Sequence, residues 1–194
     1  MLHIVDDEDV IRDALSWLAR SRGIEARAYA SAQEFLDSIN GRFDSGGDCV
    51  LLDVRMPGLN GVAMFDRLAD MQLTARLPVI FLTGHGDVPM AVDTLKRGAF
   101  DFFEKPFNDN ALMDRVQEAM AQSRAAGAAA AVQARLDGLS QREKEVLELI
   151  LSGMMNKVIA DKLGISMRTV EVHRAHIFDK MQVKTAVELA GLLK

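Results

Sequence analysis

The chain has 194 residues, of which 49% are apolar, 26% charged and 6% aromatic, and its formal net charge is −5. This composition is ordinary for a folded globular protein, so it excludes wholesale disorder, collagen-like repeats and a disulfide scaffold. Cys49 is the single cysteine, which favours a reducing compartment. No apolar run approaches the ~20 residues that span a bilayer. We therefore expect a cytoplasmic protein of one large or two small domains that does not enter a membrane.

The charge is distributed unevenly along the chain. Residues 1–138 carry 14 Lys and Arg against 21 Asp and Glu, a net charge of −7, whereas residues 139–194 carry 9 against 7, a net charge of +2. We expect a first domain over residues 1–120 and a second over 139–194. The Ala-rich segment 121–138 between them is expected to be a helical linker, weakened at Gly127, or else a flexible coil.

The first part of the sequence alternates short apolar runs with amphipathic stretches. The apolar runs predict strands at residues 2–5, 25–29, 49–52, 79–83 and 100–103. The intervening stretches predict helices at about 9–22, from 31, at 62–70, at 88–97 and from 108. Ser31 and Glu34 form a candidate capping box at the second helix. Five strands alternating with five helices imply an α/β fold, a doubly wound parallel sheet covered on both faces.

Polar side chains follow several of these strands at the edge where ligands of such sheets bind. Asp6 and Asp7 follow the first strand, Asp53 the third and Lys105 the fifth, and Thr83 ends the fourth. Three carboxylates at one edge repel one another, and Mg²⁺, which prefers oxygen ligands, relieves that repulsion. Each residue alone has a simpler explanation, as a helix cap, a loop lysine or a turn threonine. Their joint placement argues for a site.

The motifs at these positions resemble the receiver domain of a two-component response regulator. They lie at residues 4–8, 51–61, 81–87 and 103–107 and read IVDDE, LLDVRMPGLNG, FLTGHGD and FEKPF. The resemblance covers residues 1 to about 120. One departure is that Met1 directly precedes the first strand, where such chains usually have a few more residues, so we expect a short first strand.

The resemblance implies a role for each residue of the motifs. Asp53 would accept a phosphoryl group from a sensor histidine kinase, and Thr83 and Lys105 would contact the phosphoryl oxygens. Asp6, Asp7, Asp53 and the backbone carbonyl of Arg55 would hold Mg²⁺. Thr83 would move together with Phe102 as a switch, although Phe102 is alternatively an ordinary core residue. His85 is expected to be a surface loop residue.

Two enzymatic functions compete with a phosphorylated switch. Dinucleotide binding requires a Gly-rich loop after the first strand, whereas residues 6–9 are acidic and would repel a pyrophosphate. An aspartate-nucleophile, Mg²⁺-dependent phosphohydrolase is the stronger alternative. Such enzymes usually place a second Asp two residues after the nucleophile, where this chain has Arg55. We therefore expect no enzymatic activity beyond the protein's own phosphorylation and dephosphorylation.

The last part of the sequence has only helical periodicity. Ser140 and Glu143 form a capping box, and helices are expected at 156–163, 168–180 and 185–193, with a tight turn at 164–166. Two short helices joined by a three-residue turn that contains Gly are typical of a helix-turn-helix, although helical hairpins also give this pattern. Residues 139–143, 156–160, 163–166 and 168–174 resemble a LuxR/NarL-type DNA-binding domain. The whole chain thus resembles the FixJ branch of transcriptional response regulators.

Helical geometry divides residues 168–180 into two faces. Val170, His173, Ile177 and Met181 share the face expected to pack on the core. The opposite face offers side chains to the bases of the major groove of promoter DNA: Arg168, Thr169, Glu171, Val172, Ala175 and His176. Glu171 is alternatively only a solvated residue. Lys157, Arg174 and Lys180 are placed for phosphate contacts. Further expected partners are a second copy of the chain after phosphorylation, and RNA polymerase.

Overall fold

The computed structural model describes residues 1–84 and 88–193, so His85 lies outside the described residues. The chain forms two compact units, Met1–Gly127 and Ala128–Lys194. None of the described helices is long and apolar enough to cross a bilayer.

The N-terminal unit is built on a five-stranded parallel sheet with the strand order β2-β1-β3-β4-β5. The strands are β1 (Leu2–Val5), β2 (Ala26–Tyr29), β3 (Cys49–Asp53), β4 (Val79–Thr83) and β5 (Asp101–Glu104). They lie within one residue of the boundaries expected from the apolar runs. The crossover of the chain between β2 and β3 brings β1 and β3 side by side, and this places the ends of β1, β3 and β4 at the centre of one edge.

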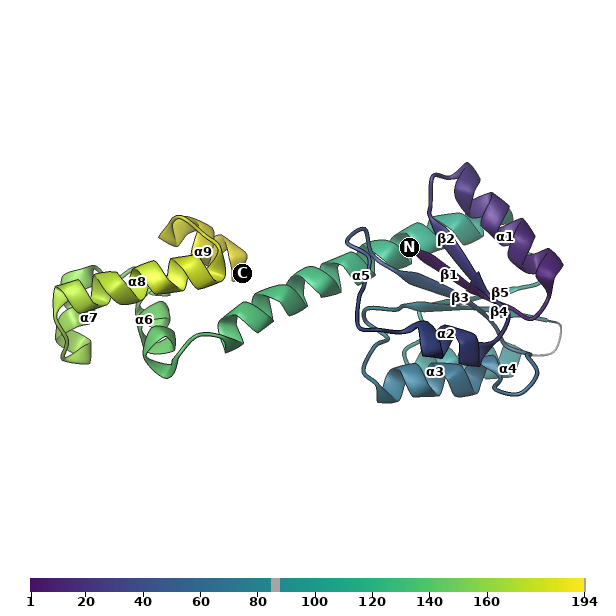
Figure 1. The fold of residues 1–194 in the computed structure, drawn as a ribbon, viewed down its shortest axis with the longest axis horizontal. Helices are drawn as coiled ribbons and strands as arrows, with labels where there is room; N and C mark the ends of the chain where they lie inside the picture. The colour runs from purple at the N-terminus through teal and green to yellow at the C-terminus, as the bar shows by residue number, and fades with distance from the viewer. Residues whose placement is uncertain (85–87, 194) are drawn as a thin grey trace. The chain divides into compact units, whose positions relative to one another are not determined.

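Helices cover both faces of this sheet, as Figure 1 shows, with α1 and α5 on one face and α2, α3 and α4 on the other. They are α1 (Asp9–Ser21), α2 (Ala32–Ser38), α3 (Gly61–Asp70), α4 (Val88–Lys96) and α5 (Asp109–Asp137). Because side chains alternate along a strand, β3 sends Cys49 and Leu51 into the core under α1 and α5, and Val50 and Leu52 into the other core. The predicted doubly wound α/β fold is confirmed.

The start of α2 differs in one detail from the expected capping box. The Ser31 hydroxyl accepts a hydrogen bond from the Glu34 amide at 3.2 Å, as predicted. The Glu34 carboxylate, however, accepts from the backbone amide of Ala30 at 2.8 Å and not from that of Ser31. The glutamate thus reaches one residue further back and fixes the segment that leads into the helix.

Helix α5 continues without interruption through the Ala-rich segment and ends at Asp137. Alanine is the best helix former, which explains why a stretch with few large apolar residues stays helical. Val132 and Leu136, near its end, pack against the core of the C-terminal unit. Residues 128–137 therefore belong to that unit by their contacts.

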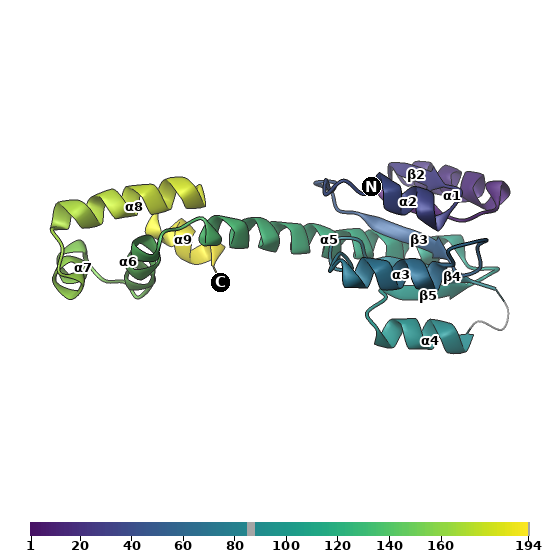
Figure 2. The ribbon, with the colours of Figure 1, turned by 60° about the horizontal axis from the view of Figure 1, so that its bottom comes forward.

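The C-terminal unit adds α6 (Gln141–Leu151), α7 (Asn156–Leu163), α8 (Met167–Met181) and α9 (Ala186–Leu192). Figure 2 shows α8 lying across α6 and α7, and both helices contact it. Gly164 ends α7 in the left-handed conformation with φ of 63°, which lets the chain turn tightly into α8. The capping box of Ser140 and Glu143 is confirmed at the start of α6. The core contains Val146, Ile150, Ile159, Val170, Ile177, Met181 and Leu189.

Candidate functional site

Two buried carboxylates and one lysine meet at the carboxyl edge of the sheet. Asp53 is the last residue of β3 and Asp6 follows β1, whose Val5 is paired with Leu52. Lys105 follows β5, and its Nζ lies 2.7 Å from Oδ1 of Asp53 and 3.0 Å from Oδ2 of Asp6. Asp6 is fully buried and Asp53 is 7% exposed. A single ammonium group thus bridges two carboxylates that the sequence separates by 47 positions.

The remaining carboxylate oxygens accept backbone hydrogen bonds. Oδ2 of Asp53 accepts from the amide of Arg55 at 2.7 Å, and Oδ1 of Asp6 accepts from the amide of Glu8 at 2.9 Å. Both oxygens of each carboxylate are therefore engaged, which fixes their orientation at the edge of the sheet. Arg12, which the sequence analysis did not single out, donates from Nη1 to the main-chain oxygen of Asp6 at 2.8 Å. This hydrogen bond supports the turn after β1 that carries Asp6 and Asp7.

Burial controls the protonation of this group. Burial raises the pKa of Asp53, because desolvation penalises the charged form. The negative charge of Asp6 raises this pKa further, and the hydrogen bond from Lys105 partly offsets the increase. Burial alone would lower the pKa of Lys105, but its hydrogen bonds to Asp53 and Asp6 outweigh that effect and raise it. The lysine therefore remains an ammonium at neutral pH. Two carboxylates against one ammonium leave the site with an excess of negative charge.

The other residues expected at the site occupy different environments. Asp7 is exposed. Thr83 is fully buried and its hydroxyl donates to the carbonyl of Phe103 at 3.5 Å, a long hydrogen bond, while the Lys105 amide donates to the Thr83 carbonyl at 2.7 Å. Phe102 is half-buried and packs against the core that contains Phe81. The core interpretation of Phe102 thus agrees with its surroundings, and its role as a switch stays a prediction.

Gly61 is a positioning residue that the sequence analysis missed. It begins α3, and a Cβ atom at this position would overlap the carbonyl oxygen of Asp53. The helix can therefore approach the end of β3 only with glycine here. The signal in the sequence was the Asn-Gly pair at residues 60–61, where Asn60 caps the helix by accepting from the amide of Ala63 at 2.8 Å.

The donor chemistry of this edge suits Mg²⁺, because it offers carboxylate and carbonyl oxygens and carries excess negative charge. In the part of the chain that the structure describes, however, no group of three or more His, Cys, Asp or Glu side chains is arranged to hold a metal ion. At this edge Asp6 and Asp53 form a buried pair that Lys105 joins, and Asp7 lies outside the pair on the surface. A metal bound here would share this pair with the lysine.

Helix α8 presents two faces that agree with the division expected from its sequence. Val170, Ile177 and Met181 are buried in the core, and His173 is half-buried. On the opposite face Thr169 is half-buried and the others are exposed: Arg168, Glu171, Val172, Ala175 and His176. Ser166 caps the helix, and its hydroxyl accepts from the Thr169 amide at 3.1 Å. This cap fixes the N-terminal end of α8, where the exposed face of the helix begins.

The three cations assigned to phosphate contacts differ in their surroundings. Lys157 is exposed on α7, and the guanidinium of Arg174 lies over the ring of Phe178, 5.4 Å from its centre. Nζ of Lys180 instead donates to Oε2 of the buried Glu143 at 2.7 Å and to the carbonyl of Gly138 at 3.3 Å. The ion pair between Lys180 and Glu143 was not predicted, because the sequence pattern assigned Glu143 only to the capping box with Ser140.

The interaction with Lys180 strongly stabilises the charged form of Glu143. The hydrogen bond from Lys180 is the largest effect, and together with the Ser140 amide and hydroxyl it outweighs burial and lowers the pKa of Glu143 to about 2. His176 Nδ1 lies 3.7 Å from the other carboxylate oxygen. This network ties the C-terminal part of α8 to the start of α6.

Comparisons with known proteins give the same two-part organisation. Residues 2–117 match the family model of the response regulator receiver domain, and residues 137–193 match that of the bacterial regulatory proteins of the luxR family. The C4-dicarboxylate transport transcriptional regulatory protein DctR of Rhodobacter capsulatus is 50% identical to this chain over 98% of both chains.

Two solved structures are similar over nearly the whole chain. Response regulator StyR is 34% identical with a TM-score of 0.74, covering 99% of this chain and 96% of its own. Full-length FixJ from B. japonicum is 41% identical with a TM-score of 0.59, covering 98% and 94%. The chain therefore belongs to the FixJ/DctR-type transcriptional response regulators of two-component systems, which join a receiver domain to a LuxR-type DNA-binding domain.

Proposed function

We propose that Asp53 is the phosphoacceptor and that a sensor histidine kinase supplies the phosphoryl group. The bridge from Lys105 to Asp53 and Asp6 is the observation that supports this proposal, because it places one cation beside a buried carboxylate at the ligand-binding edge of the sheet. A carboxylate oxygen of Asp53 forms a bond to phosphorus while the phosphorus–nitrogen bond to the kinase histidine breaks. The imidazole leaves, and the product is an aspartyl phosphate.

The surrounding residues would neutralise and position the phosphoryl group. Phosphoryl transfer is accelerated mainly by positioning and by neutralising charge on the phosphoryl oxygens. Lys105 supplies a cation whose charged form is stabilised here, and the Arg55 amide holds one oxygen of Asp53. Thr83, one residue beyond the Asp53–Leu82 pair in the sheet, would contact a phosphoryl oxygen through its hydroxyl, and Phe102 would respond to its movement.

Asp6, Asp7, Asp53 and the backbone carbonyl of Arg55 would hold Mg²⁺. When bound, the ion adds positive charge next to the phosphoryl oxygens. The excess negative charge of the Asp6, Asp53 and Lys105 group supports this assignment. Because the position two residues after Asp53 is Arg55 and not an acid, we propose a switch and not a phosphohydrolase that turns over external substrates.

The C-terminal domain would bind double-stranded promoter DNA in the cytoplasm. The exposed face of α8 supports this, with Arg168, Glu171 and Val172 directed away from the core and a cation, Lys157, exposed on the preceding helix. Arg can read guanine, Glu can accept from cytosine, and Val can contact a thymine methyl group. Phosphorylation would favour a homodimer that binds two half-sites, and RNA polymerase would be a further partner.

Incubation with acetyl phosphate and Mg²⁺ tests this function against a phosphohydrolase. We expect one stable phosphoryl group per chain and tighter binding to duplex DNA that the phosphorylated chain selects from a random library. Multiple turnover of a phosphate ester without affinity for DNA would support the hydrolase instead.

Mg²⁺ should raise the thermal stability of the receiver domain, because a ligand that binds only the folded state stabilises it. We expect a melting temperature several degrees higher in Mg²⁺ than in EDTA, measured by the fluorescence of Trp17, the single tryptophan, which lies in this domain. Asp6→Ala and Asp7→Ala should reduce the increase, whereas Asp13→Ala on α1 should not. If the Asp6 and Asp7 variants respond like the parent chain, the metal assignment is wrong.

DNA contacts can be sorted by their dependence on sequence. Arg168→Ala should weaken binding to the selected duplex by about 1–3 kcal/mol and relax the base preference at one position. Lys157→Ala should weaken binding to all duplexes alike, and Lys184→Ala, outside α7 and α8, should change neither. Fluorescence anisotropy with selected and scrambled duplexes measures these effects. An Arg168 variant that keeps its base preference would assign that residue to phosphate contact only.

A further inference from the structure

Ser123 and Gly127 are two small residues in the Ala-rich part of α5 that belongs to the N-terminal unit. Ser123 and Gly127 stand four positions apart and therefore share a face of the helix. Alanine favours helix formation more than serine does, and far more than glycine does. Helix formation therefore does not explain them, and the contacts of that face do.

Ser123 joins α5 to two distant segments of the receiver. It is fully buried, and its hydroxyl donates to the carbonyl of Arg76 at 2.6 Å and accepts from the amide of Asp48 at 2.9 Å. Nη1 of Arg76 returns a hydrogen bond to the carbonyl of Ser123 at 2.7 Å. These bonds link the helix to the residue before β3 and to the segment that leads into β4.

Two glycines allow the helix to come this close. A Cβ atom at Gly127 would overlap the Arg76 guanidinium. A Cβ atom at Gly47 would overlap the carbonyl oxygen of Met120 and lie 3.1 Å from the amide of Arg124, and Gly47 also has a φ of 92°, which favours glycine. The approach at Gly47 is to helix backbone, so no side-chain movement can make room for a larger residue there.

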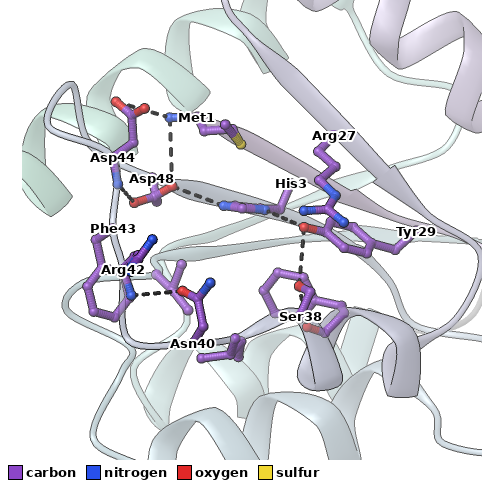
Figure 3. A pocket seen from close by; sticks show the side chains of 13 residues that line it. Met1, His3, Arg27, Tyr29, Ser38, Asn40, Arg42, Phe43, Asp44 and Asp48 are labelled. Atoms are coloured by element: carbon purple, nitrogen blue, oxygen red, sulfur yellow. Dashed lines mark hydrogen bonds and ion pairs between the residues drawn. The ribbon is translucent and has the colours of Figure 1, made fainter.

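The contact is anchored at the amino ends of the strands, opposite the edge that carries Asp53. The Asp48 carboxylate is 3.0 Å from Nε2 of His3, whose Nδ1 is 3.2 Å from the Tyr29 hydroxyl. Figure 3 shows these three side chains lining one pocket. The Arg76 guanidinium also lies over the ring of Phe43, 4.7 Å from its centre. Segments preceding or within β1, β2, β3 and β4 are thus connected, directly or through Asp48, to one serine of α5.

We propose that Gly47, Arg76, Ser123 and Gly127 form a clamp, here called the Ser123 clamp, that fixes the last turns of α5 in the receiver. The clamp extends the ordered receiver to residue 127 and holds the helix that continues toward the DNA-binding domain. Loosening the clamp should therefore weaken the change in DNA affinity that phosphorylation at Asp53 produces, because it loosens the helix that leads to the DNA-binding domain; this consequence rests on the proposed function.

Hydrogen exchange of the full chain tests the clamp without any phosphorylation. Ser123→Ala removes both hydroxyl hydrogen bonds. The loss of one hydrogen bond corresponds to about a tenfold change, so we expect amides of residues 123–127 to exchange at least about tenfold faster. Ser21→Ala is the matched control, because the Ser21 hydroxyl donates to the Leu18 carbonyl on the exposed end of α1. It should leave these amides unchanged.

A double-mutant cycle tests the clamp even if the Ser123→Ala variant does not fold. Gly127→Ala should speed exchange of the same amides in the parent, since it displaces the Arg76 guanidinium. In an Arg76→Ala background, where nothing is displaced, the same substitution should slow exchange because alanine strengthens the helix. Gly191→Ala in α9, where a Cβ meets nothing within 4 Å, should slow exchange locally in both backgrounds.

The same variants then measure the effect on signalling. With acetyl phosphate and Mg²⁺, Ser123→Ala should lose most of the gain in affinity for the selected duplex, and Ser21→Ala should keep it. Unchanged exchange in Ser123→Ala, or equal effects of Gly127→Ala in both backgrounds, would overturn the clamp. Faster exchange with the full gain in affinity would overturn its role in signalling. A parent chain that shows no gain would count against the proposed function, while the exchange results still decide the clamp.

Discussion

Asp53→Asn is expected to abolish formation of the aspartyl phosphate. The amide oxygen of asparagine is a far weaker nucleophile than a carboxylate, so no bond to phosphorus forms even if the site stays intact. Asparagine has nearly the size of aspartate, and its single amide oxygen can still accept a hydrogen bond from Lys105 or from the Arg55 amide. Incorporation of phosphorus-32 from acetyl phosphate, followed by intact-protein mass spectrometry, measures the effect, which should be complete.

The same substitution should preserve or increase stability. Burial raises the pKa of Asp53, so the folded protein binds this proton more readily than the unfolded chain does. Stability is then lost as the pH rises from the unfolded pKa through the folded one, and the ionised carboxylate disfavours folding at neutral pH. Asp53→Asn removes that effect. Its melting temperature, followed by Trp17 fluorescence, should equal or exceed that of the parent at pH 7.

Asp66→Asn is a matched control for the nucleophile. Asp66 lies on α3 in an ion pair with Arg97, and its side chain is 49% exposed. This variant should be labelled like the parent. Labelling that persists in Asp53→Asn would show that another residue is the phosphoacceptor, and loss of folding in that variant would contradict the pKa direction on which its expected stability depends.

Glu143→Gln is expected to destabilise the DNA-binding domain by about 2–3 kcal/mol at pH 7. This value follows from the difference between the ordinary pKa of Glu143 and its pKa in the folded domain, and it is reduced because solvent partly screens Lys180. The Lys180 side chain is 42% exposed, whereas that of Glu143 is 5% exposed. Glutamine keeps an oxygen acceptor for the Ser140 amide, so the substitution isolates the effect of the charge. Urea unfolding followed by circular dichroism measures it.

The dependence on pH has a definite sign. The pKa of Glu143 falls from the usual 4.5 to about 2 in the folded domain. The folded state thus holds this proton less readily, and the stabilisation is fully present above pH 4.5 and disappears as the pH falls toward 2. The difference between parent and Glu143→Gln should shrink over that range and vanish at its lower end. A difference that is constant with pH would assign the effect to packing.

Glu145→Gln serves as the control within the same helix. Glu145 pairs with Arg142 at 2.5 Å in an ion pair whose side chains are 39% and 36% exposed. Exposed pairs of this kind contribute about 0.2–1 kcal/mol, so this variant should change little. Trp17 and Tyr29, the single tryptophan and tyrosine, both lie in the receiver, and their signals should not shift in either glutamine variant.

The periodicity of the sequence was sufficient to predict most of the fold. Apolar runs such as residues 79–83 and the helix signals of Asn156–Leu163 are local features, and the structure has elements with those boundaries. The parallel order of the strands then brings Asp6, Asp53 and Lys105 to one edge, which explains why their meeting could be expected. Their atomic arrangement could not, because the bridge by Lys105 depends on the path of the chain after β5.

Contacts between distant segments left little trace in local patterns. Glu143 has the spacing of a capping box, and nothing nearby indicates that Lys180 reaches it from α8. Gly127 appeared only as a weak point of an Ala-rich helix and Ser123 did not stand out, because the Asp48 and Arg76 groups that they meet lie far earlier in the chain. In both cases the residue type is explained only once tertiary neighbours are known.

The ion pair of Lys180 and Glu143 has a consequence for how DNA binding depends on salt concentration. A protein cation contributes to the loss of DNA affinity at high salt only to the extent that it displaces condensed counterions from DNA phosphates. Lys180 donates inside its own domain, so its charge is already balanced there. The affinity of the DNA-binding domain should therefore decline less steeply with salt concentration than its number of basic residues suggests. Base contacts, and the pairing of two copies that we propose, would then carry a larger share of binding.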